Sequence, residues 1–417
     1  MQSQAQARRG AAPSDVVRHD VVIVGGGLVG ASLAIALDRM GVDAALVEAT
    51  DAGVLPAVFD QRNLSFADAT VNALETLGVM SLLRMPAAPI RRIHVSRRGD
   101  FGRVLLDAAD YGRDCFGRVV VARDFGEALE ARLSALPALT RYRPMRFLGL
   151  APGGGDARLL RLADAAGSER IVAARLLVAA DGARSTVRDA LGIGADSRDY
   201  GQALFVARVR ASRAPDGTAW ERFGDDGPTA LLPRGDGCYG MVHGVATEEA
   251  DRAAALDDRG WLARLQQAFG WRVGRFLEIG QRSRYPALRV CAERLAAERA
   301  VLVGNAAQAL HPVGAQGFNL GLRDALTLSG LIEGAADPGA QALLDTYARR
   351  RAEDRQRTLA FSDGLARFTA ARGSLPRLLR AGGMVAAHRL PALQGWLVGG
   401  GMGYRGTVPE LSRGDAE

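Results

Sequence analysis

The segment from Val301 to Asp324, VLVGNAAQALHPVGAQGFNLGLRD, holds residues whose types and spacing could bind a negatively charged ligand. Its first three residues are apolar, as in a buried strand, and are followed by Gly304. Leucines then recur at helical spacing, so Gly314 and Gly317 lie where backbone N–H groups emerge at a helix N-terminus. Such a terminus carries about half a positive charge and favours an anion or an electron-rich ring beside it. Taken alone, the segment is explained equally well as a strand-to-helix loop whose glycines permit tight packing.

A second glycine cluster, GGGLVG, lies near the N-terminus between two predicted strands. A β-rich run from Asp20 to Gly25 leads into it, a helical stretch from Ala31 to Met40 follows, and a second strand ends at Glu48. Glycines at this spacing permit a tight turn and close approach of a pyrophosphate, and an acid roughly 20 residues later binds ribose hydroxyls. The pattern predicts a dinucleotide site but does not separate FAD from NAD. Its predicted contacts are Gly25, Gly27, Gly30 and Glu48.

A third predicted strand, Leu176 to Ala180, ends in Asp181 and Gly182, and Arg184 and Arg188 follow. An acid and two arginines at a strand end suit a ligand with several phosphate groups. For Arg188 alone, a capped helix with a surface arginine explains the pattern equally well. We expect Asp181 and Gly182 to face the same nucleotide.

Together these elements resemble the single-component FAD-dependent aromatic hydroxylases. Within that group the chain is similar to the ubiquinone-biosynthesis hydroxylases, and most to those that act on 2-polyprenyl-6-methoxyphenol. The resemblance runs from about residue 20 to about residue 358. It rests on the late glycine motif, on the Asp60-Gln61-Arg62 triplet and on the segments 94–112 and 116–123. Two departures stand out: Asn305 replaces the usual aspartate, and Gly314-Ala315 stands where Ala-Gly is expected, which leaves open which N–H groups contact the flavin.

The resemblance also implies roles for individual residues. Gly317 would bring its N–H to the flavin, where the helix stabilises negative charge, and Pro312 would shape the active-site loop. His311 suits a catalytic base by its pKa class, but a histidine before a proline-glycine turn more often fixes a loop. Arg62 and Arg123 would bind on the flavin side, or either could form an ordinary surface ion pair. The full set of implied cofactor contacts is Gly25, Gly27, Gly30, Glu48, Arg62, Arg123, Asp181, Gly182, Gly304, Asn305, Gly314, Gln316, Gly317 and Asn319.

By the same resemblance, NADPH or NADH reduces FAD, O2 adds as a C4a-hydroperoxide, and its terminal oxygen passes to a lipophilic prenylated phenol to give the 1,4-benzoquinol. No metal is required, and the five histidines form no ligand-spaced cluster. Two alternatives share these motifs. An FAD-dependent reductase of prenyl chains would not consume O2. A flavin-bearing structural subunit of a quinone-synthesis complex would not oxidise NAD(P)H with any phenol.

The order of elements predicts a mixed α/β fold with a discontinuous Rossmann-like FAD-binding domain. Alternating runs such as 205–210 predict an inserted antiparallel sheet with one wet face, suited to form a wall of a substrate pocket. We expect a disordered tail at 1–18 and a helical region at 341–417. The FAD-binding domain would comprise 19–85, 113–200 and 286–340, and the substrate domain 86–112 and 201–285.

Composition narrows the functional classes. Three separated cysteines among 417 residues indicate neither disulfides nor zinc and suggest a reducing compartment. All 53 basic side chains are arginine, so chemistry that needs a lysine amine is excluded. The net charge of +7 is dispersed and no nucleic-acid motif is present, which disfavours nucleic acid.

Between Leu375 and Tyr404, arginines interleave with apolar patches, which suits either contact with an anionic membrane surface or a helical subdomain with a basic outer face. No run of about 18 uncharged apolar residues could span a bilayer. We therefore expect a cytoplasmic protein held peripherally at the inner face of the cytoplasmic membrane, with a ubiquinone-synthesis complex as a further possible partner.

Overall fold

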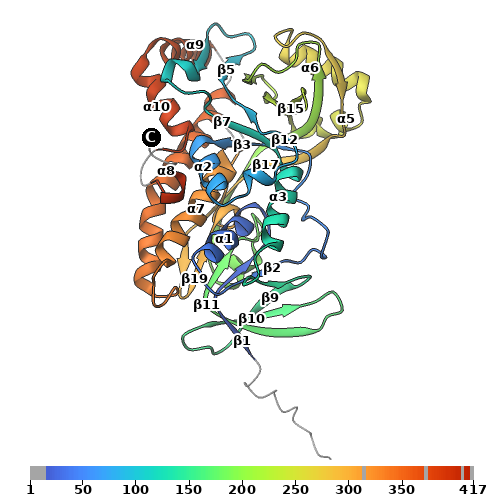
Figure 1. Cartoon of the computed structure of the whole chain (residues 1–417). Helices are drawn as coiled ribbons and strands as arrows, with labels where there is room; N and C mark the ends of the chain where they lie inside the picture. Colours follow the sequence, from blue (N-terminus) through green and yellow to red (C-terminus); the bar gives the residue numbers. More distant parts are fainter. Residues whose placement is uncertain (1–15, 312–315, 371–373, 405–407, 414–417) are drawn as a thin grey trace, which may run out of the picture.

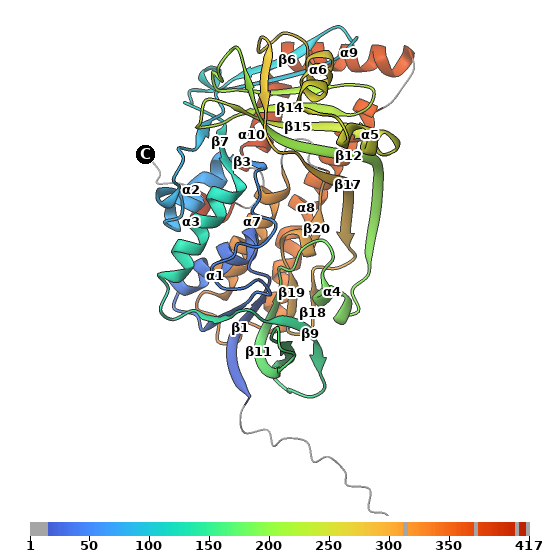
Figure 2. The same cartoon turned by 90° about the vertical axis from the view of Figure 1, so that its right-hand side faces the viewer.

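The computed structural model of the chain confirms the mixed α/β class. An eight-stranded sheet with a parallel centre and a nine-stranded, largely antiparallel sheet occupy opposite ends of the molecule, and helices flank both (Figures 1 and 2). The expected tail at 1–18 falls almost entirely outside the described residues. The structure describes residues 16–311, 316–370, 374–404 and 408–413.

Eight strands form the sheet that carries the N-terminal fingerprint: β1 (Val17–Val24), β2 (Ala44–Val47), β8 (Thr140–Tyr142), β9 (Arg146–Ala151), β10 (Arg158–Ala163), β11 (Glu169–Ala179), β18 (Ala296–Ala297) and β19 (Ala300–Leu302). Their order is β18-β19-β11-β1-β2-β8, and β10 and β9 extend it from β11. The central strands run parallel, with Val21 opposite both Leu176 and Ala44. Toward their C-terminal ends these strands are apolar because helices cover them, which places the largest hydrophobic core here.

Nine strands form the second sheet: β5 (Arg92–Arg97), β6 (Arg103–Asp107), β12 (Ala195–Ala211), β13 (Thr218–Phe223), β14 (Pro228–Pro233), β15 (Tyr239–Ala246), β16 (Phe276–Ile279), β17 (Ser283–Ala292) and β20 (Gln308–Ala309). The order is β20-β17-β12-β15-β14-β13-β5-β6, with β16 also paired to β12. Helices α5 (Ala250–Ala254) and α6 (Asp258–Phe269) cover one face, where Trp261 and Phe269 complete a second core. On the opposite face, Ala230 and Val242 line a cavity.

The nine-stranded sheet differs from the sequence-based expectations in three respects. β6, β13, β16, β17 and β20 were not predicted as strands. β12 begins at Ala195 and β17 ends at Ala292, so both strands cross the expected domain limits at 200 and 286. The predicted wet face of 205–210 is present only in part: Arg208 and Arg210 reach solvent, but every residue from 203 to 207 is buried. Phe205 and Ala207 pack on the α6 side, while Leu204 and Val206 are covered on the other.

The remaining elements surround these sheets. A small sheet joins β3, β7 and β4 in that order, and α1 and α7 pack against each other beside the eight-stranded sheet. The bounds are β3 (Asn63–Ala67), β4 (Ala88–Pro89), β7 (Gly117–Val121), α1 (Leu28–Arg39), α2 (Asp68–Thr76), α3 (Ala122–Ser134), α4 (Thr186–Ala190), α7 (Gln316–Ile332), α8 (Gln341–Ala370), α9 (Ser374–Arg389) and α10 (Pro391–Gly401), with short 3-10 turns at 80–82, 108–111, 247–249, 304–306 and 410–412.

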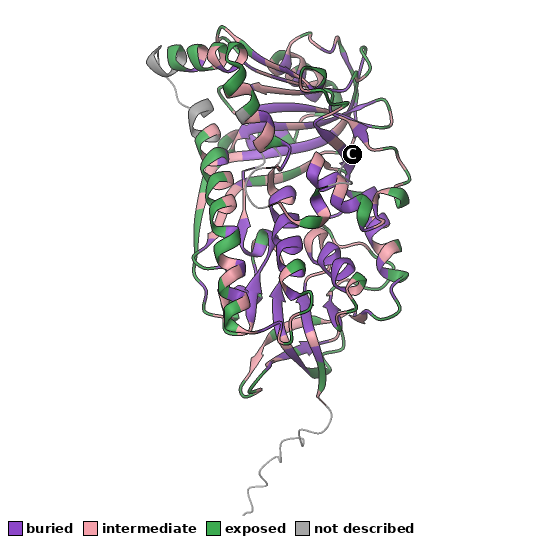
Figure 3. Ribbon diagram, turned by 60° about the vertical axis from the view of Figure 1, so that its left-hand side comes forward, coloured by how far each residue is buried: buried purple, intermediate pink, exposed green. Residues whose placement is uncertain are grey.

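The C-terminal helices return to the nine-stranded sheet instead of forming a separate appendage. Ala387 on α9 and Val398 on α10 share a small core with Val104 and Leu106 of β6. The buried Arg380 donates to Asp100 at 3.0 Å. The outer surface of α9 remains largely exposed (Figure 3). Among the described residues, none of the helices is long and apolar enough to cross a membrane.

Candidate active site

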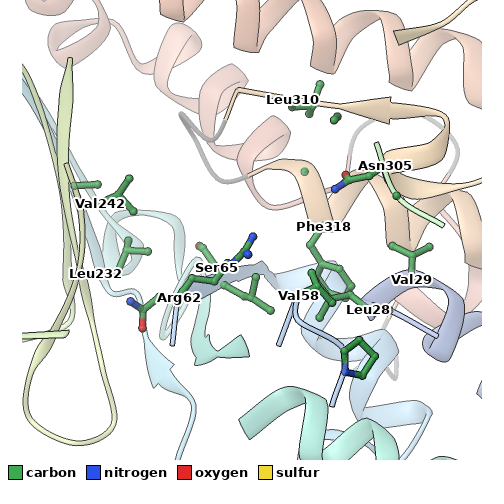
Figure 4. Close-up of a pocket in the computed structure, with 18 of the residues that line it drawn as sticks. Leu28, Val29, Val58, Arg62, Ser65, Leu232, Val242, Asn305, Leu310 and Phe318 are labelled. Atoms are coloured by element: carbon green, nitrogen blue, oxygen red, sulfur yellow. The ribbon is translucent and has the colours of Figure 1, made fainter. Parts of the chain in front are cut away.

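A cavity of about 580 Å3 lies between the two large sheets and is lined from both (Figure 4). Figure 4 shows Leu232 and Val242 of the nine-stranded sheet on one side, and Val29, Asn305 and Phe318 on the other. We call the first side the sheet wall; it comprises Ile93, Ala219, Glu221, Ala230, Leu232 and Val242. We call the other the cofactor end; it comprises Gly25, Gly27, Glu48, Asp181, Gly182, Asn305 and Gly317.

The glycines of the first fingerprint permit contacts that a side chain would prevent. Gly25 has a φ of +109°, and a Cβ on Gly30 would lie 1.9 Å from the Gly25 carbonyl oxygen. Gly30 therefore packs α1 against the turn and does not itself line the cavity. Within the described chain, no side chain caps α1 at Gly27, so the first-turn N–H groups remain available to a phosphate. This end of the cavity fits the pyrophosphate of a dinucleotide.

Glu48 follows β2 and lines the cavity beside these glycines. Its carboxylate accepts the N–H of Gly26 at 2.9 Å and the N–H of Thr50 at 2.7 Å. A carboxylate oxygen can accept further hydrogen bonds, so Glu48 keeps capacity for ribose hydroxyls while it holds the loop. The geometry fits the adenosine half of FAD.

Asp181 and Gly182 line the cavity where β11 ends. The Asp181 carboxylate accepts the Val187 N–H at 3.1 Å and the Thr186 hydroxyl at 3.2 Å, so it also organises the start of α4. Gly182 has a φ of +88°, a conformation that side chains rarely adopt. Arg188 is buried and donates to the Ala306 and Ala183 carbonyls, so it braces the loop and does not line the cavity.

The late glycine segment divides into residues that line the cavity and residues that support it. Gly317, Phe318 and Asn305 line it. A Cβ on Gly317 would meet no atom of the described residues within 4 Å, so a side chain there would extend into the cavity that Gly317 lines. Gly304 has a φ of +59° and donates its N–H to Asp324 at 3.1 Å, which makes it a turn residue behind the site.

Two predicted contacts of α7 lie away from this cavity. Asn319 is buried and accepts the Ala67 N–H at 2.9 Å and the Thr70 hydroxyl at 2.8 Å, so it joins α7 to β3 and α2. Gln316 lines a different cavity, of about 400 Å3, between α8 and α10. Helical geometry explains both placements, because neighbouring residues on a helix point in different directions.

The two predicted arginines are separated by the fold. Arg62 lines the cavity, forms an ion pair with Asp60 at 2.9 Å and lies over the Tyr285 ring at 4.3 Å. Arg123 is 62% exposed on α3 and pairs with Glu127 at 3.6 Å. Of the two roles that the sequence allowed for Arg123, flavin binding or a surface ion pair, this position fits the surface ion pair.

The predicted catalytic loop is described only in part. Pro312 and Gly314 lie outside the described residues. His311 is buried against Tyr200, with ring centroids 4.8 Å apart, and is not among the cavity residues. Burial lowers the pKa of His311 to about 4, so the imidazole is neutral near neutral pH. This position supports the loop-fixing interpretation.

Sequence analysis missed a buried charge network behind the cofactor end. Asp324 and Arg351 are each 1% exposed and bond at 2.7 Å. The Asp324 carboxylate also accepts the Gly304 N–H and, at 2.6 Å, the Gln308 side-chain amide. The signal was present, because Asp324 falls on the leucine-rich face of a predicted helix, where a charged residue needs a buried partner.

It also missed Glu221 on β13, the acid of the sheet wall. Burial raises the pKa of the Glu221 carboxyl to about 7. The short run TAWERF shows no clear alternation of apolar and polar residues, so the sequence did not predict a strand there.

Comparison with known proteins identifies the family. Residues 18–362 match the FAD binding domain family. Ubiquinone hydroxylase UbiL of Rhodospirillum rubrum is 35% identical over 399 residues, covering 94% of this chain and 92% of that protein. The 3-demethoxyubiquinol 3-hydroxylase of Escherichia coli is 29% identical, covering 90% of this chain and 96% of that protein.

Solved structures show the same fold. The p-nitrophenol 4-monooxygenase PnpA of Pseudomonas putida superposes with a TM-score of 0.78 and covers 94% of this chain and 99% of its own, at 20% identity. At that identity the likeness concerns the fold alone.

Proposed function

The chain belongs to the FAD-dependent ubiquinone-biosynthesis hydroxylases, and from this premise we propose that it converts 2-polyprenyl-6-methoxyphenol to the 1,4-benzoquinol. As a member of that family it is a flavin-dependent aromatic monooxygenase of ubiquinone synthesis that uses FAD, O2 and a nicotinamide reductant. When bound at this site, reduced FAD would supply an electrophilic oxygen derived from O2. The protein's own task is to hold the ring beside it and exclude water.

One observation carries the proposal: a single cavity is lined by dinucleotide-binding glycines at one end and by apolar side chains at the other. At the cofactor end, the start of α1 would hold the pyrophosphate and Glu48 the ribose. The Gly317 N–H would meet the flavin, where a helix N-terminus favours negative charge. The apolar sheet wall suits a phenol ring whose prenyl chain is lipophilic.

The test is steady-state turnover of the purified holoprotein with a prenylated 6-methoxyphenol. We expect the phenol to accelerate NAD(P)H oxidation and O2 uptake together, and mass spectrometry to show a product heavier by one oxygen atom. A product reduced in its prenyl chain without O2 uptake would favour a prenyl reductase. Bound FAD with no phenol-stimulated NAD(P)H oxidation would favour a structural subunit of a quinone-synthesis complex.

We further propose that α9 holds the protein peripherally at the inner face of the cytoplasmic membrane. Leu378 and Leu379 are 69% and 59% exposed, and Leu390 at the end of the helix is 53% exposed. Arg389, adjacent to Leu390, is also exposed. Exposed leucines next to arginine suit insertion at an anionic lipid surface, where each well-placed arginine contributes about 1 kcal/mol.

Because α9 shares a buried core with β6, point substitutions test this better than truncation of the C-terminal region. We expect the double variant Leu378→Gln, Leu379→Gln to sediment less with anionic vesicles at low salt, and added salt to release the wild type. The control is Leu148→Gln, Ile171→Gln, two exposed residues on β9 and β11 at the opposite end of the molecule (Figure 1). Equal binding by both double variants would place the contact elsewhere or on a partner protein.

A further inference from the structure

The sheet wall of the cavity is apolar except at one position. Along β13, Ala219 and Glu221 share a face because side chains alternate on a strand. Glu221 lies opposite Ala230 of β14, and Ala230 lies opposite Val242 of β15. All four residues line the cavity. The carboxyl of Glu221 therefore projects among small apolar side chains on the substrate side of the site.

The other charged residues that line the cavity already have partners. Glu48 and Asp181 accept backbone N–H groups at the cofactor end, and Arg62 is paired with Asp60. Among the described residues, the Glu221 carboxyl has neither a hydrogen-bond partner nor an ion-pair partner. A carboxyl that borders an apolar cavity without a partner is costly unless a ligand supplies one.

We propose that Glu221 receives the ring hydroxyl of the phenol substrate and accepts its proton as the ring is hydroxylated. The phenol O–H bond breaks and a new O–H bond forms on the carboxylate, with no change in oxidation state. The electron pair stays on the ring oxygen and enriches the ring carbons that attack an electrophilic oxygen. This role rests on the proposed function, because it requires a phenol in the cavity.

The carboxyl must be ionised to accept a proton. Burial raises the pKa of the Glu221 carboxyl to about 7. The carboxylate that accepts the proton is therefore gained as pH rises through neutrality and lost as pH falls. Charges on the adjoining elements are engaged elsewhere. Arg97 on β5 pairs with Asp225 and Asp100, and Arg380 on α9 also pairs with Asp100. Arg222 on β13 donates to the Ala268 carbonyl. The His94 ring on β5 packs against the Trp220 ring.

The first test is the pH dependence of wild-type hydroxylation. We expect kcat/KM to rise from about pH 6 to about pH 8 and the Glu221→Gln variant to lose this rise. Gln keeps the size of the side chain and removes the base, so turnover should fall about a hundredfold or more while FAD content is retained. Glu278→Gln on β16 is the matched control, because Glu278 is 57% exposed in a surface pair with Arg210.

The second test varies the acidity of the phenol. Ring-fluorinated phenols lose their proton without help, so Glu221→Gln should be rescued progressively as the phenol pKa falls, while the wild type changes little. Glu221→Asp, which keeps a carboxylate, should retain part of the pH dependence. These readouts separate a proton acceptor from a residue that only shapes the cavity.

The outcomes distinguish the two proposals. A wild type that hydroxylates no phenol would overturn the proposed function. A wild type that hydroxylates phenols with a flat pH profile, or a Glu221→Gln variant that is equally impaired at every pH and for every phenol, would overturn the role of Glu221 alone. Should Glu221→Gln fail to bind FAD, the wild-type pH profile and the Glu221→Asp variant still decide the question.

Discussion

The cofactor end of the cavity is lined by glycines and by residues of the loops that follow strands, whereas the sheet wall is lined by residues within strands. Gly25 and Gly30 leave no room for a Cβ, and Glu48 holds the loop through two N–H groups. The sheet wall instead takes Ala230 and Val242 from strands that meet only in the folded protein. Cofactor binding should therefore be sensitive to small local changes, and substrate binding to the shape of a distributed surface.

The largest effect should come from the charge network behind the cofactor end. Asp324→Asn leaves the buried Arg351 with Asp354, at 2.7 Å, as its one remaining carboxylate partner among the described residues. Breaking a buried pair costs about 3 to 5 kcal/mol, and Asp354 should keep the loss near the lower figure. Urea unfolding measures this loss in the free energy of unfolding. Glu353→Gln, in an exposed pair with Arg357, should change the free energy of unfolding little; equal losses would show that the buried network does not stabilise this region.

The next effect should be on cofactor affinity. Glu48→Ala removes a carboxylate that holds the loop and faces the ribose site, and a charged hydrogen bond contributes about 1.5 to 3 kcal/mol. FAD affinity should fall about tenfold to a hundredfold or more, as measured by fluorescence titration of the apoprotein. Glu298→Ala, at a 75% exposed surface position, is the control. An unchanged dissociation constant for Glu48→Ala would contradict its role at the ribose.

Gly317→Val should separate cofactor binding from reaction. The new side chain would extend into the cavity, where overlap with the flavin costs roughly 1 to 3 kcal/mol. Hydroxylation should be lost although part of the FAD remains bound. At Gly330, on an exposed part of α7, a Cβ would meet no atom of the part of the chain that the structure describes within 4 Å, so the same change should leave turnover intact. Normal turnover by Gly317→Val would mean that this helix does not face the flavin.

The smallest effect should be on the sheet wall. Leu232→Ala removes apolar contact from the substrate side, so the KM for the phenol should rise about tenfold while FAD affinity stays constant. Leu277→Ala, at an exposed position on β16 of the same sheet, should change neither quantity. A parallel loss of FAD from Leu232→Ala would show that the two ends of the cavity do not act separately.

This difference between the two ends also explains what the sequence could predict. The fingerprint needs glycines close together in the chain, so its strand, its helix and the acceptor Glu48 follow from spacing alone. Helix α7 was also predicted, because its leucines follow the helical period. In contrast, β13 escaped notice because Glu221 and Arg222 interrupt its apolar residues.

Long-range pairing explains the remaining errors. Nothing local in the sequence shows that Asn319 bonds to residues near 67, or that α9 packs on β6. Arg62 and Arg123 look alike in sequence, yet only Arg62 reaches the cavity, because Arg123 points outward from α3. Which of several similar residues enters a site depends on helix orientation and strand pairing, and these are set by the whole fold.

The central claim is that one cavity brings FAD and a phenol together for oxygen transfer from O2. The most direct measurement is turnover of the FAD-loaded protein with NAD(P)H and a prenylated 6-methoxyphenol under isotopically heavy O2 in ordinary water. We expect one heavy oxygen atom in the hydroxylated ring, in proportion to NAD(P)H consumed. Product oxygen derived from water, or NAD(P)H oxidation that the phenol does not accelerate, would contradict it.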